Sequence, residues 1–187
     1  MKREQSMAVF EHGLDFHSLD DAVAYARLCL TAGYDRTGNW DLAQTCRHMT
    51  DWLRAPLDRP PPIPWLMKLP MAMVRLTFGP GILRSFLTER KLPAGMGTME
   101  STVYPPEPDA TAAVDEFAAT AARFAAHTGP WLRPSPLFGK LDPERTLAIQ
   151  LVHCMHHLGR LKPRAKNARA ESGAAADGGV ARRRGSP

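Results

Sequence analysis

Three histidines have a spacing that would let two helices hold one metal ion. His153 and His157 stand four residues apart in LVHCMHHLGRL, so on a helix their side chains share one face. His48 lies far upstream in NWDLAQTCRHMTDWL, and its imidazole would have to come from a neighbouring helix. Three nitrogen ligands leave coordination positions open, as in catalytic metal sites, whereas structural zinc sites are closed by four protein ligands.

The same histidines also have a simpler interpretation. Pairs at this spacing arise by chance in many helices, where the imidazole is a hydrogen-bonded side chain at the edge of a core. His156 is an alternative partner for His153, because two histidines three residues apart on a helix could also bind one ion. The apolar stripe favours His153 and His157, which flank it, whereas His156 points nearly opposite and is expected behind the ligands or at the surface. That stripe consists of Leu147, Leu151, Cys154, Leu158 and Leu161.

The residues around the candidate ligands have less specific roles. His48 also flanks an apolar stripe, formed by Leu42, Cys46, Met49 and Leu53. Gln150 lies one turn before His153 and is the best candidate to orient a ligand. The thiols of Cys46 and Cys154 lie in apolar stripes, which favours buried core residues over ligands. The histidines outside the pattern, expected at the surface, are His12, His17 and His127.

Composition predicts one domain with a basic tail. The 187 residues, 44% of them hydrophobic, are enough for a single core. Residues 162–187 hold seven Lys or Arg and two acidic residues, so residues 1–161 carry 17 charges of each sign. The expected domain, 1–161, is therefore neutral and shows no basic patch for nucleic acid. The tail, 162–187, lacks aromatic residues and is expected to be disordered.

Cellular location follows from cysteines and from hydropathy. Three cysteines without CxxC spacing argue against a disulfide framework or a zinc ribbon and favour reduced thiols in the cytoplasm. The N-terminus lacks the continuous apolar segment of a signal peptide. The longest apolar stretch, PWLMKLPMAMVRLTFGPGIL, is interrupted by Lys68, Pro70 and Arg75, so we expect no membrane span and no membrane partner.

Helix signals predict an all-α fold. A first helix should begin at Ser18, with Asp21 as its capping-box partner, and end at Gly33. A second should follow Asn39 or Asp41. The second helix should end before Pro56. A third helix is expected after Asp109, and a fourth should begin with Asp142 and Pro143 and break before Pro163. No strand pattern competes, and four amphipathic helices predict a four-helix bundle.

A long excursion separates the second helix from the third. The segment RPPPIP, 59–64, should be extended, because successive prolines fix the backbone. Two short apolar segments follow, at about 65–78 and 81–90, and the first holds Met67, Met71 and Met73. A methionine cluster is usually adaptable core, but in this excursion it could roof a pocket.

Over residues 10–161 the chain resembles the DinB-like superfamily, also called DinB/YfiT, of bacterial four-helix bundles, and is closest to an uncharacterised branch of it. The resemblance rests on the order of GNWDLAQTCRHM (38–49), PWLMK (64–68), KLPAG (91–95), PLFGKL (136–141) and VHCMHHLGR (152–160). It implies that His48, His153 and His157 bind a divalent metal ion. One departure is Ser135, where that branch tends to carry histidine before the PLFG-like segment.

The resemblance also implies a chemistry, because characterised relatives include transferases and isomerases that use small thiols. A free thiol ionises near pKa 8.5, whereas a thiol on a metal ion is deprotonated at neutral pH. The expected cofactor is zinc, with nickel and ferrous iron as alternatives. The expected partners are a small thiol and a small electrophile, and a homodimer is compatible with the sequence. The competing hypothesis is a non-catalytic bundle that keeps the fold and the metal.

Overall fold

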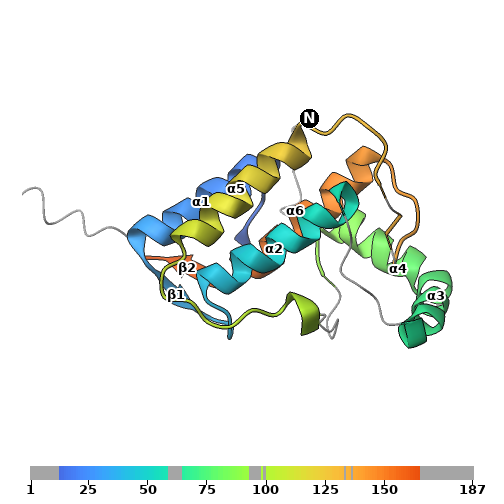
Figure 1. Cartoon of the computed structure of the whole chain (residues 1–187), viewed down its shortest axis with the longest axis horizontal. Helices are drawn as coiled ribbons and strands as arrows, with labels where there is room; N and C mark the ends of the chain where they lie inside the picture. The colour runs from blue at the N-terminus through green and yellow to red at the C-terminus, as the bar shows by residue number, and fades with distance from the viewer. Residues whose placement is uncertain are drawn as a thin grey trace, which may run out of the picture.

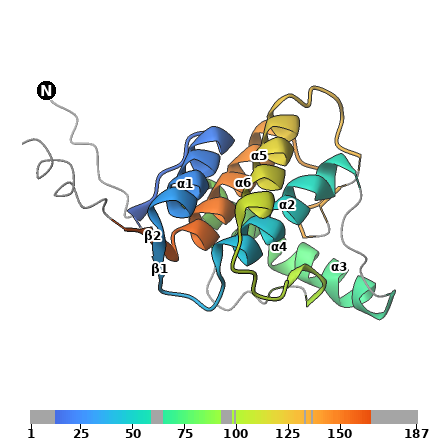
Figure 2. The same ribbon diagram turned by 60° about the vertical axis from the view of Figure 1, so that its left-hand side comes forward.

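The structure is a computed structural model that describes residues 13–58, 65–92, 98, 100–132, 134–135 and 137–164. Its four longest helices form a bundle (Figure 1). They are α1 (Leu19–Ala32), α2 (Leu42–Leu57), α5 (Thr111–Ala125) and α6 (Pro143–Leu158). Helices α5 and α6 each pack against both α1 and α2, and the turned view shows the four helices around a shared interior (Figure 2). The expected all-α four-helix bundle is confirmed.

Three of the four expected helix starts have the cap that their sequence predicts, whereas α5 begins after Ala110, which makes no side-chain capping hydrogen bond. Ser18 Oγ accepts a hydrogen bond from the Asp21 backbone N–H at 3.2 Å, and the Asp21 carboxylate accepts from the Ser18 N–H, which completes the capping box. Of the two candidates for α2, Asp41 is the cap, with Gln44 as its partner. Asp142 caps α6 directly before Pro143. These local signals fix where the site-bearing helices begin.

Helix α2 does not stop before Pro56, so that expectation was wrong. The helix continues to Leu57 with Pro56 inside its last turn. Proline has no N–H to donate, which leaves the Trp52 carbonyl without its usual helical partner. Gln150 of α6 supplies one, because its Nε2 donates to the Trp52 carbonyl at 3.1 Å. Gln150 thus joins α6 to α2, rather than orienting a histidine as expected.

A small sheet, which the sequence patterns did not predict, closes one end of the bundle. Strand β1 (Tyr34–Arg36) pairs antiparallel with β2 (Leu161–Pro163). Helix α6 therefore ends at Leu158, earlier than the expected break before Pro163. Arg164 continues the contact by pairing with Asp35 at 2.9 Å. The ordered pairing extends past the expected boundary at residue 161, while the rest of the tail, 165–187, lies outside the described residues.

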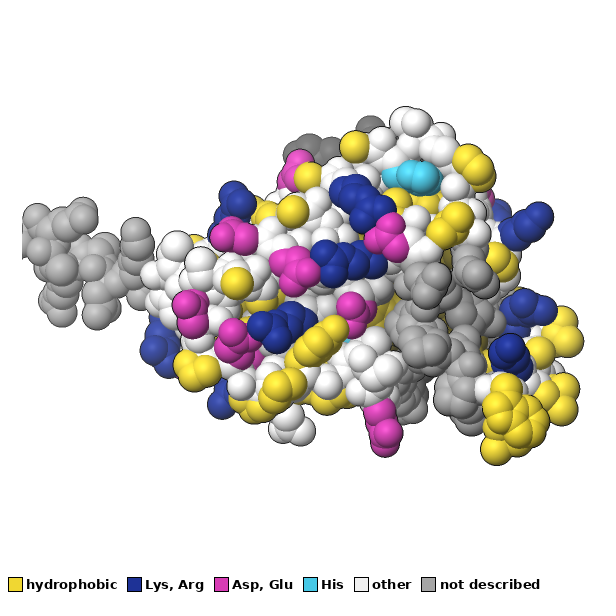
Figure 3. Space-filling model, viewed as in Figure 1, with side chains coloured by type: hydrophobic (Ala, Val, Ile, Leu, Met, Phe, Trp, Pro, Cys, Tyr) yellow, Lys and Arg dark blue, Asp and Glu magenta, His cyan; other side chains and the backbone are white. Residues whose placement is uncertain are grey.

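The described part of the excursion between α2 and α5 contains several short helices, which coincide with its two apolar segments. It contains η2 (Trp65–Met67), α3 (Lys68–Thr77), α4 (Gly79–Arg84), η3 (Ser85–Glu89) and η4 (Glu100–Thr102). Helix α3 leaves Leu69, Met73 and Leu76 exposed, and apolar side chains gather over it on the surface (Figure 3). The proline run 59–64 lies outside the described residues. None of the described helices combines the length and the apolar character that a membrane crossing requires.

The three thiols are buried in the helical core, as their apolar stripes predicted. Burial raises the pKa of Cys29 to about 11 and that of Cys154 to about 12, and the pKa of Cys46 is raised further by burial. We therefore expect native protein at pH 8 to react slowly with a thiol reagent such as DTNB, and denatured protein to show all three thiols at once. A fast-reacting thiol in the native protein would contradict this burial.

The hydrogen bond from Gln150 to the Trp52 carbonyl should stabilise the packing of α6 on α2. Replacing Gln150 with Ala leaves a carbonyl without a partner and should lower the free energy of unfolding by about 1–3 kcal/mol. The same change should cost clearly less in a Pro56→Ala background, because that substitution restores a backbone N–H that can donate to the Trp52 carbonyl. Urea unfolding of the two single variants and the double variant measures this coupling. Equal losses in both backgrounds would disprove it.

Candidate metal centre

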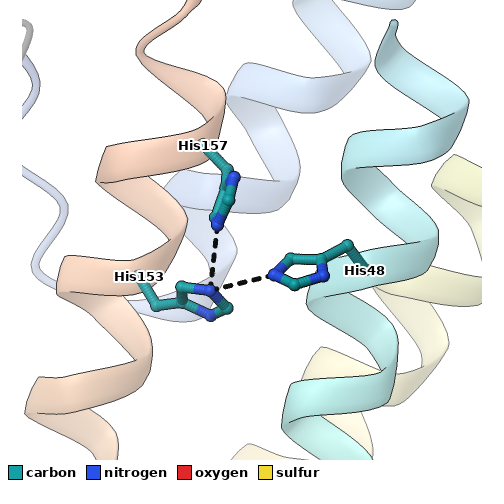
Figure 4. Close-up of side chains that lie close together, drawn as sticks. All are labelled: His48, His153 and His157. Carbon is teal, nitrogen blue, oxygen red and sulfur yellow. Dashed lines mark hydrogen bonds between the residues drawn. The ribbon is translucent and has the colours of Figure 1, made fainter. Parts of the chain in front are cut away.

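The three predicted histidines meet between α2 and α6 (Figure 4). His153 lies in the middle, with its Nε2 atom 3.1 Å from Nε2 of His48 and 3.0 Å from Nε2 of His157. The three candidate ligand atoms all lie within 4.8 Å of one another. His48 is buried, whereas His153 and His157 keep part of their surface accessible. His48, distant in the sequence, therefore lies close enough to His153 and His157 for the three to bind one metal ion.

The orientation of His48 is fixed by a backbone carbonyl. Its Nδ1 atom lies 3.1 Å from the carbonyl oxygen of Thr102 in η4. A carbonyl only accepts, so Nδ1 must carry the hydrogen, and in a neutral imidazole Nε2 then carries none. The bare Nε2 lone pair of His48 consequently faces the other two histidines.

The segment that provides this carbonyl is fastened along α2 by polar side chains. Gln44 Nε2 donates to the Tyr104 carbonyl at 2.6 Å, and the Tyr104 hydroxyl donates to Asp51 at 2.5 Å. The carboxylate of Asp41, besides capping α2, accepts a hydrogen bond from the Glu107 backbone N–H at 2.9 Å. These contacts hold the chain after η4 against the face of α2 that carries His48. We call residues 102–107 the strap.

Two tryptophan rings enclose the imidazoles. Trp40 stacks on His157, with ring centroids 5.1 Å apart and planes 8° apart, and meets His48 edge-on at 4.8 Å. Trp52 meets His153 edge-on at 5.4 Å. Rings packed in this way restrict rotation of the imidazoles and keep their Nε2 atoms directed at one another.

Burial favours the neutral form of the three clustered histidines. Burial lowers the pKa of His48 to about 4, although its hydrogen bond to Thr102 acts in the opposite direction. Burial, together with the neighbouring histidines, also holds the pKa of His153 and that of His157 well below the usual range. The neutral imidazole is the form that binds metal ions.

Hydrogen atoms alone cannot satisfy both contacts of His153. Because Nε2 of His48 carries no hydrogen, the contact at 3.1 Å needs one on Nε2 of His153. Once Nε2 of His153 donates its single hydrogen to His48, it has none left to donate to Nε2 of His157, 3.0 Å away. If Nε2 of His157 carried a hydrogen as well, the two hydrogens would face each other. One of the two contacts must therefore be repulsive in the neutral, metal-free cluster. A cation between the three nitrogens would accept a lone pair from each.

A cavity of about 260 Å³ adjoins one of the three histidines. His157 forms part of its wall together with Trp40, Asn39 and Arg160. A larger, more apolar cavity of about 450 Å³ lies beside Trp52 and Gln150 and contains none of the three histidines in its lining. No described residue of 65–78 lines either of these two cavities, so neither of them is roofed by the methionine-rich segment. Of these two cavities, only the polar one has a histidine of the cluster in its lining.

The remaining histidines and Ser135 lie outside the cluster. His156 lines the polar cavity, with its Nε2 atom 3.4 Å from Arg160, and does not join the three candidate ligands. His17 is exposed, as expected. His127 lies at the surface, as expected, with its ring partly covered by stacking on Trp131. Ser135 pairs with Gly139 in a tight loop, and its hydroxyl accepts a hydrogen bond from Phe138. His12 lies outside the described residues.

Comparison with known proteins gives one family match. Residues 10–164 match the family model described as a protein of unknown function (DUF1569). No curated protein and no solved structure matches the chain. The match spans the whole bundle, from the residues before α1 through β2, and includes all three histidines of the cluster. The chain therefore belongs to the DUF1569 family.

Proposed function

We propose that this protein binds one divalent metal ion through the Nε2 atoms of His48, His153 and His157. The observation that carries the proposal is the pair of close Nε2 contacts around His153, which hydrogens cannot both satisfy. A metal ion resolves that conflict and uses the neutral state that burial imposes on all three imidazoles.

The spacing of the nitrogens supports the proposal. Two imidazole nitrogens on one tetrahedral zinc ion lie about 3.3 Å apart, which follows from Zn–N bonds of about 2.0–2.1 Å. The contacts of 3.0 and 3.1 Å around His153 would have to lengthen by only a few tenths of an ångström. All three candidate atoms lie within 4.8 Å of one another, so any longer separation among them would have to shorten when the ion binds.

The three nitrogen ligands favour a metal ion that is intermediate between hard and soft. Three imidazoles without carboxylate or thiolate suit zinc, nickel or ferrous iron, and zinc is our first choice. Ligation by cysteine is disfavoured, because burial raises the pKa of Cys46 and of Cys154 in the apolar interior. Three protein ligands leave at least one position for an exogenous molecule.

We further propose that this open position activates a small thiol for transfer to an electrophile. The resemblance to DinB-like bundles supports this chemistry. When bound, the ion would keep the thiol ionised at neutral pH. The S–H proton passes to solvent, the sulfur forms a bond to an electrophilic carbon, and the displaced group leaves with its electron pair. His157 and Trp40 would position the thiol, because both line the polar cavity beside the cluster.

The cytoplasm is the location that we propose for this reaction. The three cysteines are unpaired, and a thiol substrate stays reduced in that compartment.

The metal site can be tested by elemental analysis of protein purified without an affinity tag. We expect about one zinc, nickel or iron ion per chain, and near-complete loss in the His48→Ala, His153→Ala and His157→Ala variants. His156→Ala is the matched control, because His156 neighbours the site without joining it. Circular dichroism of each variant separates ligand loss from misfolding. A metal-free native protein that stays so after incubation with all three ions would refute the site.

The transfer reaction needs a separate test. Metal-loaded protein, chelated protein and His153→Ala should be assayed side by side with a panel of small thiols and model electrophiles. We expect conjugation above background only in the metal-loaded native protein. Equal rates in all three samples would exclude the mechanism. Metal binding without conjugation for any pair would favour the non-catalytic bundle.

A further inference from the structure

The polar cavity beside His157 carries positive charge and no acidic residue. Its lining includes Arg160 and Asn39, and neither Asp nor Glu is present among the described residues that form it. A divalent ion on three neutral imidazoles keeps its full charge, because imidazole brings none. The space next to the proposed ion is therefore electropositive, which favours an anionic ligand.

Arg160 is held in this cavity by its backbone and by the shape of the opposite loop. The Thr37 N–H donates to the Arg160 carbonyl at 2.8 Å, which ties the end of α6 to the chain after β1. The Arg160 side chain lies across Gly38, where a Cβ atom would come within 3.1 Å of its Cδ. Glycine at this position gives the arginine room to lie along the loop.

The guanidinium of Arg160 has no carboxylate partner in the described part of the chain. Its Nη2 atom lies 3.4 Å from Nε2 of His156, which is a long contact to an imidazole rather than to a carboxylate. Other arginines of the bundle do pair with acids, such as Arg164 with Asp35 and Arg54 with Glu116. A guanidinium presents a planar fork of donors that matches the two oxygens of a carboxylate.

We infer that the site takes a small thiol that also carries a carboxylate, with the sulfur on the metal ion and the carboxylate on Arg160. This inference rests on the proposed metal-dependent thiol chemistry and names its substrate class. A cavity of about 260 Å³ is large enough for a compact mercapto acid. Arg160 acts as a specificity residue, because it selects among thiols that the ion alone would bind alike.

Matched thiols on cobalt-loaded protein provide the test. Mercaptoacetate and 3-mercaptopropionate carry the carboxylate, and 2-mercaptoethanol and 3-mercapto-1-propanol are their neutral counterparts. The absorption band of cobalt-bound thiolate reports the Kd of each. The variants are Arg160→Gln and Arg160→Lys, with Arg36→Gln as a control that removes the same charge from nearby β1 outside the cavity lining.

We expect native protein to bind at least one acid more tightly than its neutral counterpart. Arg160→Gln should reduce that preference about tenfold or more, with cobalt content unchanged. Arg160→Lys should recover part of it, and Arg36→Gln should retain it. A preference that persists in Arg160→Gln would reflect chelation by the acid itself and would overturn the inference, as would equal binding of acids and alcohols by native protein. Failure to bind cobalt, or any thiol, would instead refute the proposed function on which the inference rests.

Discussion

The alignment of α6 along α2 is the constraint on which the site depends. Two contacts fix this alignment. His48 contacts His153, and one turn further along α2 the Trp52 carbonyl accepts a hydrogen bond from Gln150. A shift of one helix by a single turn, about 5.4 Å, would break both contacts. Pro56 contributes indirectly. Because it has no backbone N–H, the Trp52 carbonyl has no helical partner and can accept a hydrogen bond from Gln150. An irregularity at the end of one helix therefore helps to align the imidazoles.

Burying a cluster of imidazoles in a helical core lowers the stability of the fold. Buried polar groups destabilise a fold unless their hydrogen-bonding capacity is satisfied. The strap satisfies Nδ1 of His48 through the Thr102 carbonyl, but the Nε2 atoms around His153 remain in conflict. A bound ion would remove that conflict and stabilise the folded chain in proportion to its affinity. The retention of this cluster in the bundle is easier to explain as a ligand set than as packing.

Much of the bundle could be predicted because its signals are local. Ser18 with Asp21, and Asp142 with Pro143, identify helix starts within a few residues, and the spacing of His153 and His157 follows from one helical turn. His48 could be included because its position on the edge of an apolar stripe indicates which way it faces.

The missing parts depend on contacts between distant segments. Thr102 contributes a backbone carbonyl, which leaves no trace in residue type, and Gln150 finds its partner only once α6 lies against α2. The pairing of β1 with β2 joins two segments of three residues that lie far apart in the sequence, and each is too short for an alternating pattern to be visible. The cavity at His157 was not foreseen either, because it forms where the end of α6 meets the loop after β1.

X-ray absorption at the K-edge of the bound metal can decide whether the three histidines are the ligands, because it reports the ligand atoms themselves. For thiol-free protein we expect three imidazole nitrogens at about 2.0–2.1 Å, with the remaining positions filled by light atoms from solvent. Adding a thiol should bring one sulfur to about 2.3 Å while the three imidazoles stay. Sulfur in the thiol-free spectrum, or a shell closed by four protein ligands, would contradict an open three-histidine site.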